Sequence, residues 1–218
     1  LDRPSAIRLL PADLDPGALC VLGEEFLRVY DKKRGTLRYA VETPSRVLDA
    51  AIVGEGPART LVIAGPGEIR GVPFDRGEPE RFRLPIAGPD EPEKLLQDVR
   101  FGPRTFTALA GTALRAFDAS GTPVWERTLP SRARAPLCSC GNALVAFAAL
   151  GGAVWIIDRD TGSVTAELAS GTADERVSAP PVSAGPSHAL AIYGRELCLV
   201  DAASAAVRWR RRAGDFAP

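Results

Sequence analysis

A hairpin-like segment that ends in aspartate recurs five times along this chain of 218 residues. In each copy an apolar run, a short turn and a second apolar run come before the acid, which is Asp31, Asp75, Asp118, Asp158 or Asp201. Successive members lie 44, 43, 40 and 43 residues apart. A period of about 40–45 residues is typical of one four-stranded propeller blade or of a two-helix repeat.

The segment at 105–118, TFTALAGTALRAFD, favours strands over helices. Its apolar runs are too short for helices, and they are continuous, as in strands buried on both faces. Similar hairpins occupy 18–31, 60–75, 143–158 and 189–201. Hairpin turns need backbone with positive φ, which glycine adopts readily. We expect this conformation at the glycines between the runs, which are Gly23, Gly67, Gly111, Gly151, Gly152 and Gly194.

A second turn follows each aspartate, and an aspartate that opens a turn accepts hydrogen bonds from the backbone two residues on. In three of these turns a glycine follows the aspartate by three or four residues, at Gly35, Gly121 and Gly162. Tyr39 and Trp125 each follow such a glycine by four residues, and Trp209 has the same place after Ala205. The fourth unit has Ala166 there, and the second unit, interrupted by Pro79, lacks the aromatic residue.

The segment AFDASGTPVW, from Ala116 to Trp125, resembles the repeat of the pyrroloquinoline-quinone-like propeller family. That repeat has the form Ala-x-Asp-x-x-Thr-Gly-x-x-x-Trp, and IIDRDTG from Ile156 is similar to its first half. In this family the tryptophan docks one blade against the next. The resemblance implies this structural role for Trp125 and Trp209, and more loosely for Tyr39.

We therefore predict an all-β fold, a β-propeller or propeller segment of about five four-stranded blades that spans 1–218. The repeat units lie near 5–45, 46–88, 98–131, 132–171 and 176–213. Asp90 and the following leucines favour a short helix inserted at 89–98. The sequence at 214–218 is similar to the segments that open units four and five. This likeness favours an arc of a larger ring over five blades that close on themselves.

Composition and scattered motifs point away from several kinds of chemistry. Lys+Arg and Asp+Glu both number 27, so the chain lacks the basic footprint of nucleic-acid binding. No run reaches the roughly 18 apolar residues of a transmembrane helix. The single histidine, His188, is more typical of a structural role than of a hydrolytic triad. The four cysteines favour buried thiols over a disulfide or a metal site, and they are Cys20, Cys138, Cys140 and Cys198.

The resemblance does not extend to the quinone cofactor. The dehydrogenases of that family have eight blades, a vicinal cysteine pair and a calcium site, whereas Ser139 separates Cys138 and Cys140 here. We expect no metal, cofactor or catalytic residue.

The expected function is that of a non-catalytic scaffold for protein–protein interaction, part of a larger bacterial protein or assembly in the envelope or the cytoplasm. Its partners would be other protein domains or chains, including the remaining blades of a ring. A propeller hydrolase or lyase and a small-ligand sensor are the alternatives. The innermost strands, with LCSC at 137–140 and PVSA at 181–184, lack the carboxylates or histidine that acid–base catalysis uses.

Overall fold

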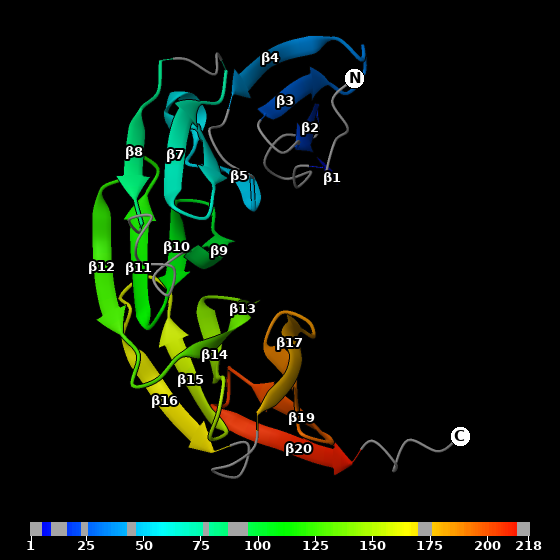
Figure 1. Ribbon diagram of the computed structural model, residues 1–218, viewed down its shortest axis with the longest axis vertical. Helices are drawn as coiled ribbons and strands as arrows, with labels where there is room; N and C mark the ends of the chain where they lie inside the picture. Colours follow the sequence, from blue (N-terminus) through cyan, green and yellow to red (C-terminus); the bar gives the residue numbers. More distant parts are fainter. Residues whose placement is uncertain are drawn as a thin grey trace. The chain divides into compact units, whose positions relative to one another are not determined.

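The computed structural model describes residues 6–9, 17–22, 26–42, 47–75, 79–86, 96–169 and 176–212 (Figure 1). Over these ranges twenty strands form five four-stranded sheets, and the remaining regular element is a single 3₁₀ turn at Gly56–Ala58. The described part of the chain holds no helix with the length and apolarity needed to cross a membrane. The all-β prediction and the five units of four strands are confirmed.

Each sheet is built from four strands that are consecutive in sequence and neighbours in space. Sheet 1 contains β1 (Ala6–Leu9), β2 (Ala18–Leu22), β3 (Phe26–Asp31) and β4 (Leu37–Glu42). Sheet 2 contains β5 (Asp49–Val53), β6 (Thr60–Ala64), β7 (Glu68–Pro73) and β8 (Phe82–Pro85). Sheet 3 contains β9 (Leu96–Phe101), β10 (Thr105–Ala110), β11 (Ala113–Asp118) and β12 (Pro123–Thr128). Sheet 4 contains β13 (Ala133–Cys140), β14 (Ala143–Ala148), β15 (Ala153–Asp158) and β16 (Val164–Ala169). Sheet 5 contains β17 (Val177–Ser183), β18 (His188–Tyr193), β19 (Glu196–Asp201) and β20 (Ala206–Arg212).

The predicted helix at 89–98 meets the structure only at its end, because 87–95 lie outside the described residues. Residues 96–98 belong to strand β9, so the prediction is wrong there. Leu96 and Val99 are both buried, and the backbone N–H of Leu96 donates to the Pro66 carbonyl over 2.8 Å. Strand β9 lies beside β10 in sheet 3, and its first residue also bonds to the turn of sheet 2, so the segment is extended where the leucines suggest a helical turn.

The predicted hairpin glycines largely adopt positive φ. Gly111, Gly151, Gly152 and Gly194 have φ of 61°, 88°, 64° and 54°. Gly67 is not among the glycines with positive φ, and Gly23 lies outside the described residues.

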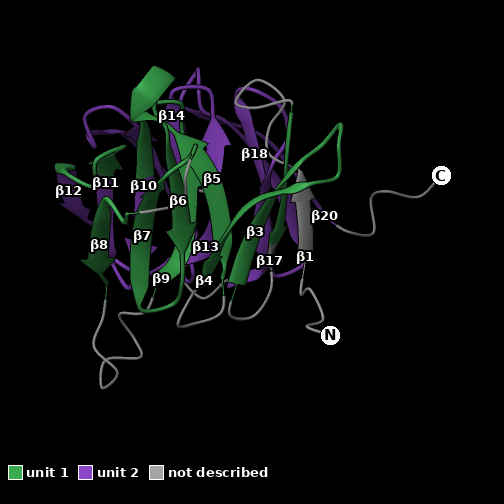
Figure 2. Ribbon diagram, turned by 90° about the horizontal axis from the view of Figure 1, so that it is seen from above, with its two compact units in different colours: residues 1–106, 117–123 green, residues 107–116, 124–218 purple. Residues whose placement is uncertain are grey.

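By packing, the chain divides into two compact units, and the division runs through sheet 3 (Figure 2). The first unit comprises 1–106 and 117–123, and its main apolar cluster joins buried residues of sheets 1 and 2. The second comprises 107–116 and 124–218. It holds one cluster of residues from sheets 3 and 4 and another from sheets 4 and 5.

Sheet 4 shows why the apolar runs are continuous. Leu144 and Ala146 contribute to the cluster shared with sheet 3, whereas Val145 and Phe147 contribute to the cluster shared with sheet 5. Alternate side chains of one strand thus point to two different cores, because successive residues face opposite sides of a sheet. The four cysteines are all buried in such cores, as predicted.

Candidate functional site

The aspartate turns have the geometry that their sequence predicts. Asp158 Oδ1 accepts hydrogen bonds from the backbone N–H groups of Asp160 and Thr161, over 3.1 and 2.8 Å. The Thr161 hydroxyl donates to the same oxygen over 2.8 Å. Gly162 closes the turn with φ of 69° and donates its N–H to the Asp158 carbonyl. The Thr161 hydroxyl and backbone N–H together hold the pKa of Asp158 below its ordinary value.

The same turn forms at three of the other four aspartates. Asp31, Asp118 and Asp201 each accept backbone N–H groups from residues two to four positions ahead. The carboxylate of Asp75 accepts a hydrogen bond from the Arg59 guanidinium over 3.2 Å, and the residues that follow it, 76–78, lie outside the described part of the chain. In the fifth unit Ala205 replaces the glycine yet keeps φ at 50°. Four copies of the repeat therefore share one backbone conformation.

Trp125 docks sheet 3 onto the turn of sheet 4. Its indole lies against Gly162, where an added Cβ would come within 2.5 Å of the ring. Its Nε1 donates to the carbonyl of Arg159 over 2.8 Å. Two residues further along β12, Arg127 Nε donates to the carbonyl of Gly162 over 3.1 Å. We call this pair of contacts, an indole on a glycine turn and an arginine on its carbonyl, the Trp-x-Arg clamp.

Phe82 performs the corresponding docking in the second unit, so the prediction that this unit lacks the aromatic residue is wrong. Its ring lies against Gly121, where an added Cβ would come within 2.5 Å of the ring. Phe82 also stacks on Phe106, with ring centroids 6.0 Å apart. A usable signal is the distance from the aspartate: Phe82 follows Asp75 by seven residues, as Trp125 follows Asp118. The residue four places before Phe82 is Glu78, so the spacing from a turn glycine does not reveal this equivalence.

Tyr39 and Trp209 have unlike surroundings although they share a repeat position. Tyr39 is partly buried and packs against the cluster of sheets 1 and 2. Trp209 lies in β20 with 36% of its surface exposed. The expectation that Trp209 is held between two sheets is therefore not met among the described residues.

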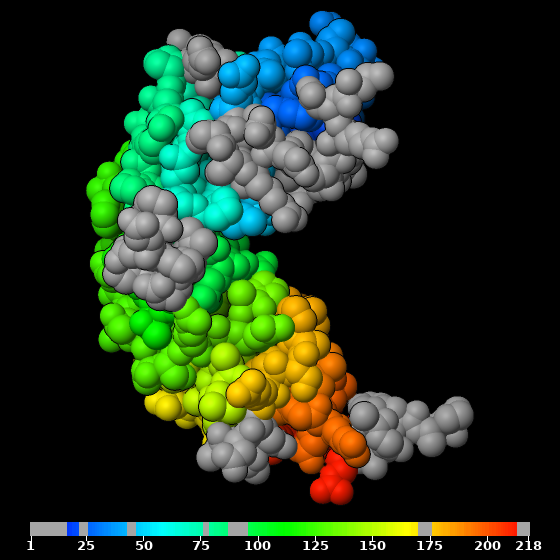
Figure 3. All heavy atoms as spheres, viewed as in Figure 1, coloured from blue at the N-terminus to red at the C-terminus, as the bar shows by residue number. Residues whose placement is uncertain are grey.

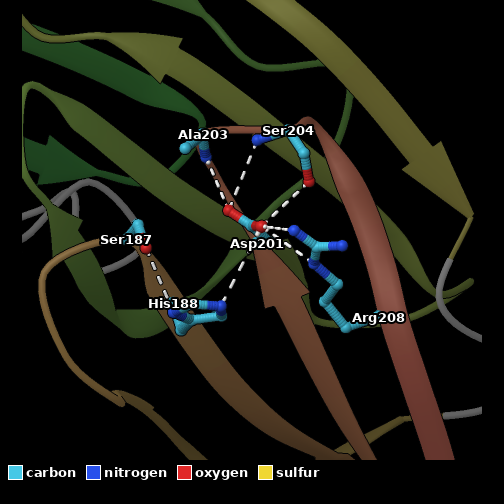
Figure 4. A network of polar contacts seen from close by, with 6 residues as sticks. All are labelled: Ser187, His188, Asp201, Ala203, Ser204 and Arg208. Atoms are coloured by element: carbon cyan, nitrogen blue, oxygen red, sulfur yellow. Dashed lines mark hydrogen bonds and ion pairs between the residues drawn. The ribbon is translucent and has the colours of Figure 1, made fainter.

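The carboxylate of Asp201, in sheet 5, is the centre of a network of polar contacts (Figure 4). It is 3% exposed and accepts hydrogen bonds from Arg208 Nε over 2.8 Å and from the Ser204 hydroxyl over 2.9 Å. These two side chains, Arg208 first, hold the pKa of Asp201 far below its ordinary value. Every contact around the carboxylate except that with His188 comes from its own turn or the next strand.

Ser187, His188 and Asp201 share the residue types of a hydrolytic triad without its geometry. Ser187 Oγ lies 3.1 Å from His188 Nδ1, but His188 Nε2 lies 3.9 Å from the nearest oxygen of Asp201. That separation is too long for the hydrogen bond by which a triad carboxylate orients the imidazole. The carboxylate is moreover already neutralised by Arg208. The arrangement supports a structural role for all three.

A shallow hollow in the second unit lies beside this network and is lined by Cys140, Asn142, Asp158, Thr165 and Ser187, among others. Asp158 is occupied by its own turn, and burial raises the pKa of the Cys140 thiol, which disfavours the nucleophilic thiolate. Among the described residues no group of three or more His, Cys, Asp or Glu side chains is arranged to hold a metal ion.

Exposed aliphatic side chains recur at one repeat position on edge strands of three sheets. Leu37, Val124 and Val164 each follow the repeat aspartate by six residues and are 51%, 49% and 37% exposed. They lie in β4, β12 and β16, each the fourth strand of its sheet. We call these three residues the outer aliphatic positions.

Comparison with known proteins supports the fold alone. No family model and no curated protein matches the chain. The crystal structure of the computationally designed Ika8 protein is similar with a TM-score of 0.68 and 13% identity, over 95% of this chain and 61% of that one. Hsv2p of Kluyveromyces lactis is similar with a TM-score of 0.65 and 12% identity, over 91% and 62% respectively. The chain thus spans about three fifths of the length of each.

Proposed function

We propose that this chain is a propeller-type scaffold that binds other proteins and carries out no chemistry of its own. The observation that carries the proposal is the recurrence of exposed aliphatic residues at the outer aliphatic positions. Edge strands often carry charged residues, which prevent unwanted pairing. Contiguous exposed apolar surface marks sites of protein–protein interaction, and the repeated position of residues such as Val124 and Val164 supports a surface that a partner covers.

The polar groups of the chain favour the same function over the enzymatic alternative. The buried carboxylate of Asp201 is satisfied by its own turn and by Arg208. The thiol of Cys140 is buried and has a raised pKa. General acid–base catalysis needs a group that can reach a substrate and exchange a proton near neutral pH. Neither residue meets that requirement, so binding is the better supported function.

Site-specific photocrosslinking tests the proposal. A benzophenone amino acid would replace Val124 or Val164 in the full chain, expressed in the source cells, with Glu167 as the matched exposed control on β16. We expect discrete protein adducts from the two aliphatic positions and few from position 167. Val164→Asp should abolish the adducts of position 124 without lowering the melting temperature. Equal labelling from all three positions would contradict the proposal.

The hydrolase alternative is tested separately. An organofluorophosphonate reacts with a serine that a neighbouring base activates. We expect Ser187 to remain unmodified. Stoichiometric modification of Ser187 that disappears in His188→Ala would identify an enzyme and overturn the assignment.

A further inference from the structure

One surface of sheet 5 is apolar and uncovered among the described residues. A single row of cross-strand partners crosses all four strands: Val182 pairs with Leu190, Leu190 with Leu199, and Leu199 with Trp209. Val182 and Trp209 are 53% and 36% exposed, and the two leucines are half-buried. Ile192, 36% exposed, and Leu197 form the next row on the same side. We call this surface the open face, and the sheet that carries it is drawn in gold to red in Figure 3.

The opposite side of sheet 5 packs against sheet 4. Ala189, Ala191, Cys198 and Val200 alternate with the residues of the open face, and all four are buried in the cluster shared with sheet 4. Sheet 5 is therefore apolar on both sides but packed on only one of them among the described residues. An antiparallel sheet with one solvated side normally alternates apolar and polar residues. The open face has apolar residues where that pattern has polar ones, which indicates that another part of a protein packs against it.

Sheet 4 shows what covers this surface elsewhere in the repeat. Its equivalent row pairs Cys138 with Val145, Val145 with Ile156, and Ile156 with Ala166. The first three are at most 2% exposed, because they pack against sheet 5. The same row of the same repeat is thus buried by a following sheet in one case and exposed in the other.

The fourth strand of sheet 5 repeats the Trp-x-Arg clamp. In β12 this clamp consists of Trp125 on Gly162 and Arg127 on the Gly162 carbonyl. In β20 the same spacing gives Trp209 and Arg211, both exposed. Sheets 2 and 4 have no arginine two residues after the docking position. The clamp needs a turn with a left-handed glycine and a free carbonyl, which is a more specific requirement than apolar surface.

We propose that the open face docks a further four-stranded sheet of this same repeat, whose aspartate–glycine turn receives Trp209 and Arg211. The inference rests on the proposed scaffold function and names the partner of one surface. Its tests are independent of the outer aliphatic positions, because none of those residues belongs to the open face. Failure here would leave the crosslinks of Val124 and Val164 unchanged.

An extended chain supplies a suitable sheet as the probe. Residues 214–218 are similar to 132–136, which precede Leu137. A copy of 137–169, appended after Pro218, therefore adds one sheet with its own Gly162 turn in the natural spacing. Hydroxyl-radical footprinting read by mass spectrometry measures the oxidation of Trp209 individually. The copied Trp155 is read separately, because its tryptic peptide begins within 213–218.

We expect Trp209 to be oxidised several-fold less in the extended chain than in the original chain, while the copied Trp155 is protected. The matched control carries Gly162→Leu in the appended copy only, which fills the space that the indole would occupy. Protection of Trp209 should be lost in that control. Arg211→Ala in the extended chain should weaken the protection without affecting the native Trp155.

Three results would overturn the proposal. Trp209 could remain as reactive in the extended chain as in the original one. The copied Trp155 could be fully oxidised, which would mean that the open face does not support the folding of a following sheet. Trp209 of the original chain could become protected with rising concentration, together with self-association in sedimentation, which would make a second copy of the chain the occupant.

Discussion

The indole of Trp125 lies flat enough against Gly162 that no side chain could replace the glycine hydrogen without moving the ring. The tryptophan belongs to the fourth strand of one sheet and the glycine to the turn after the third strand of the next. The hydrogen bond from Trp125 Nε1 to the Arg159 carbonyl fixes the ring on the same turn. A single residue pair therefore links the aspartate turn to the packing of sheet on sheet.

Gly162→Ala should be distinctly more destabilising than Gly35→Ala. Both glycines have positive φ, 69° and 66°, so both substitutions carry the cost of left-handed backbone, about 1–2 kcal/mol. Among the described atoms, a Cβ at Gly35 would meet nothing within 4 Å, whereas one at Gly162 would meet the Trp125 ring at 2.5 Å. We expect a further loss of about 1–3 kcal/mol at Gly162 from this overpacking. Chemical denaturation of the two variants measures the difference, and equal losses would contradict the docking.

Trp125→Ala and Trp209→Ala should have unequal effects on the free energy of unfolding. Trp125 is partly buried, and its indole N–H donates a partly buried hydrogen bond to the Arg159 carbonyl. Its removal should therefore lower the free energy of unfolding by about 3 kcal/mol. Trp209 is 36% exposed, and its removal should cost about 1 kcal/mol or less. Fluorescence quenching by iodide gives an independent measure. Quenching should fall markedly in the Trp209→Ala variant and little in the Trp125→Ala variant.

Ala205→Gly should stabilise the chain by about 0.5–1 kcal/mol. Ala205 is the one non-glycine residue with positive φ in the described part of the chain, at 50°, and glycine has no Cβ to strain there. Ala203→Gly in the same turn is the matched control and should destabilise instead, since it only increases the freedom of the unfolded chain. Thermal unfolding compares the two. A loss of stability in Ala205→Gly would show that methyl packing outweighs the backbone strain.

The carboxylate of Asp201 should make the stability of the chain depend on acid. Hydrogen bonds from Arg208 and Ser204 depress its pKa in the folded state, so this contribution is present above the unfolded pKa of about 3.9. It is lost progressively as pH falls below that value. Asp201→Asn should therefore be less stable than the parent at pH 7, and the difference should shrink below about pH 4. Urea titrations at several pH values measure it, and a constant difference would exclude the carboxylate as its source.

The repeat made most of the fold predictable from sequence, because each unit carries its own turn chemistry. Asp31, Asp118, Asp158 and Asp201 announce a turn whose hydrogen bonds are local, and local interactions leave a local pattern. Gly121 and Gly162 could be recognised for the same reason. The strand at 96–98 could not, since Leu96 and Val99 are placed by pairing with other strands.

The docking residues were only partly predictable, because docking depends on a neighbouring sheet. Phe82 is not found by counting four residues from a turn glycine, because Glu78 stands at that place, and the count from Asp75 is needed to align it. Trp209 could be aligned correctly with the repeat, but the sequence around it does not reveal whether a following sheet packs on it. Burial of such a residue is a property of its neighbour.

Because each described apolar cluster draws its residues from two successive sheets, the sheets within each compact unit behave energetically like a one-dimensional stack. Its stability is then approximated by the sum of the sheets and of the contacts between nearest neighbours. A substitution in the core between sheets 1 and 2 should leave the core between sheets 4 and 5 unaltered. Gene duplication could accordingly lengthen such a stack by one sheet at a time, with only the two contacts at the point of insertion to be remade.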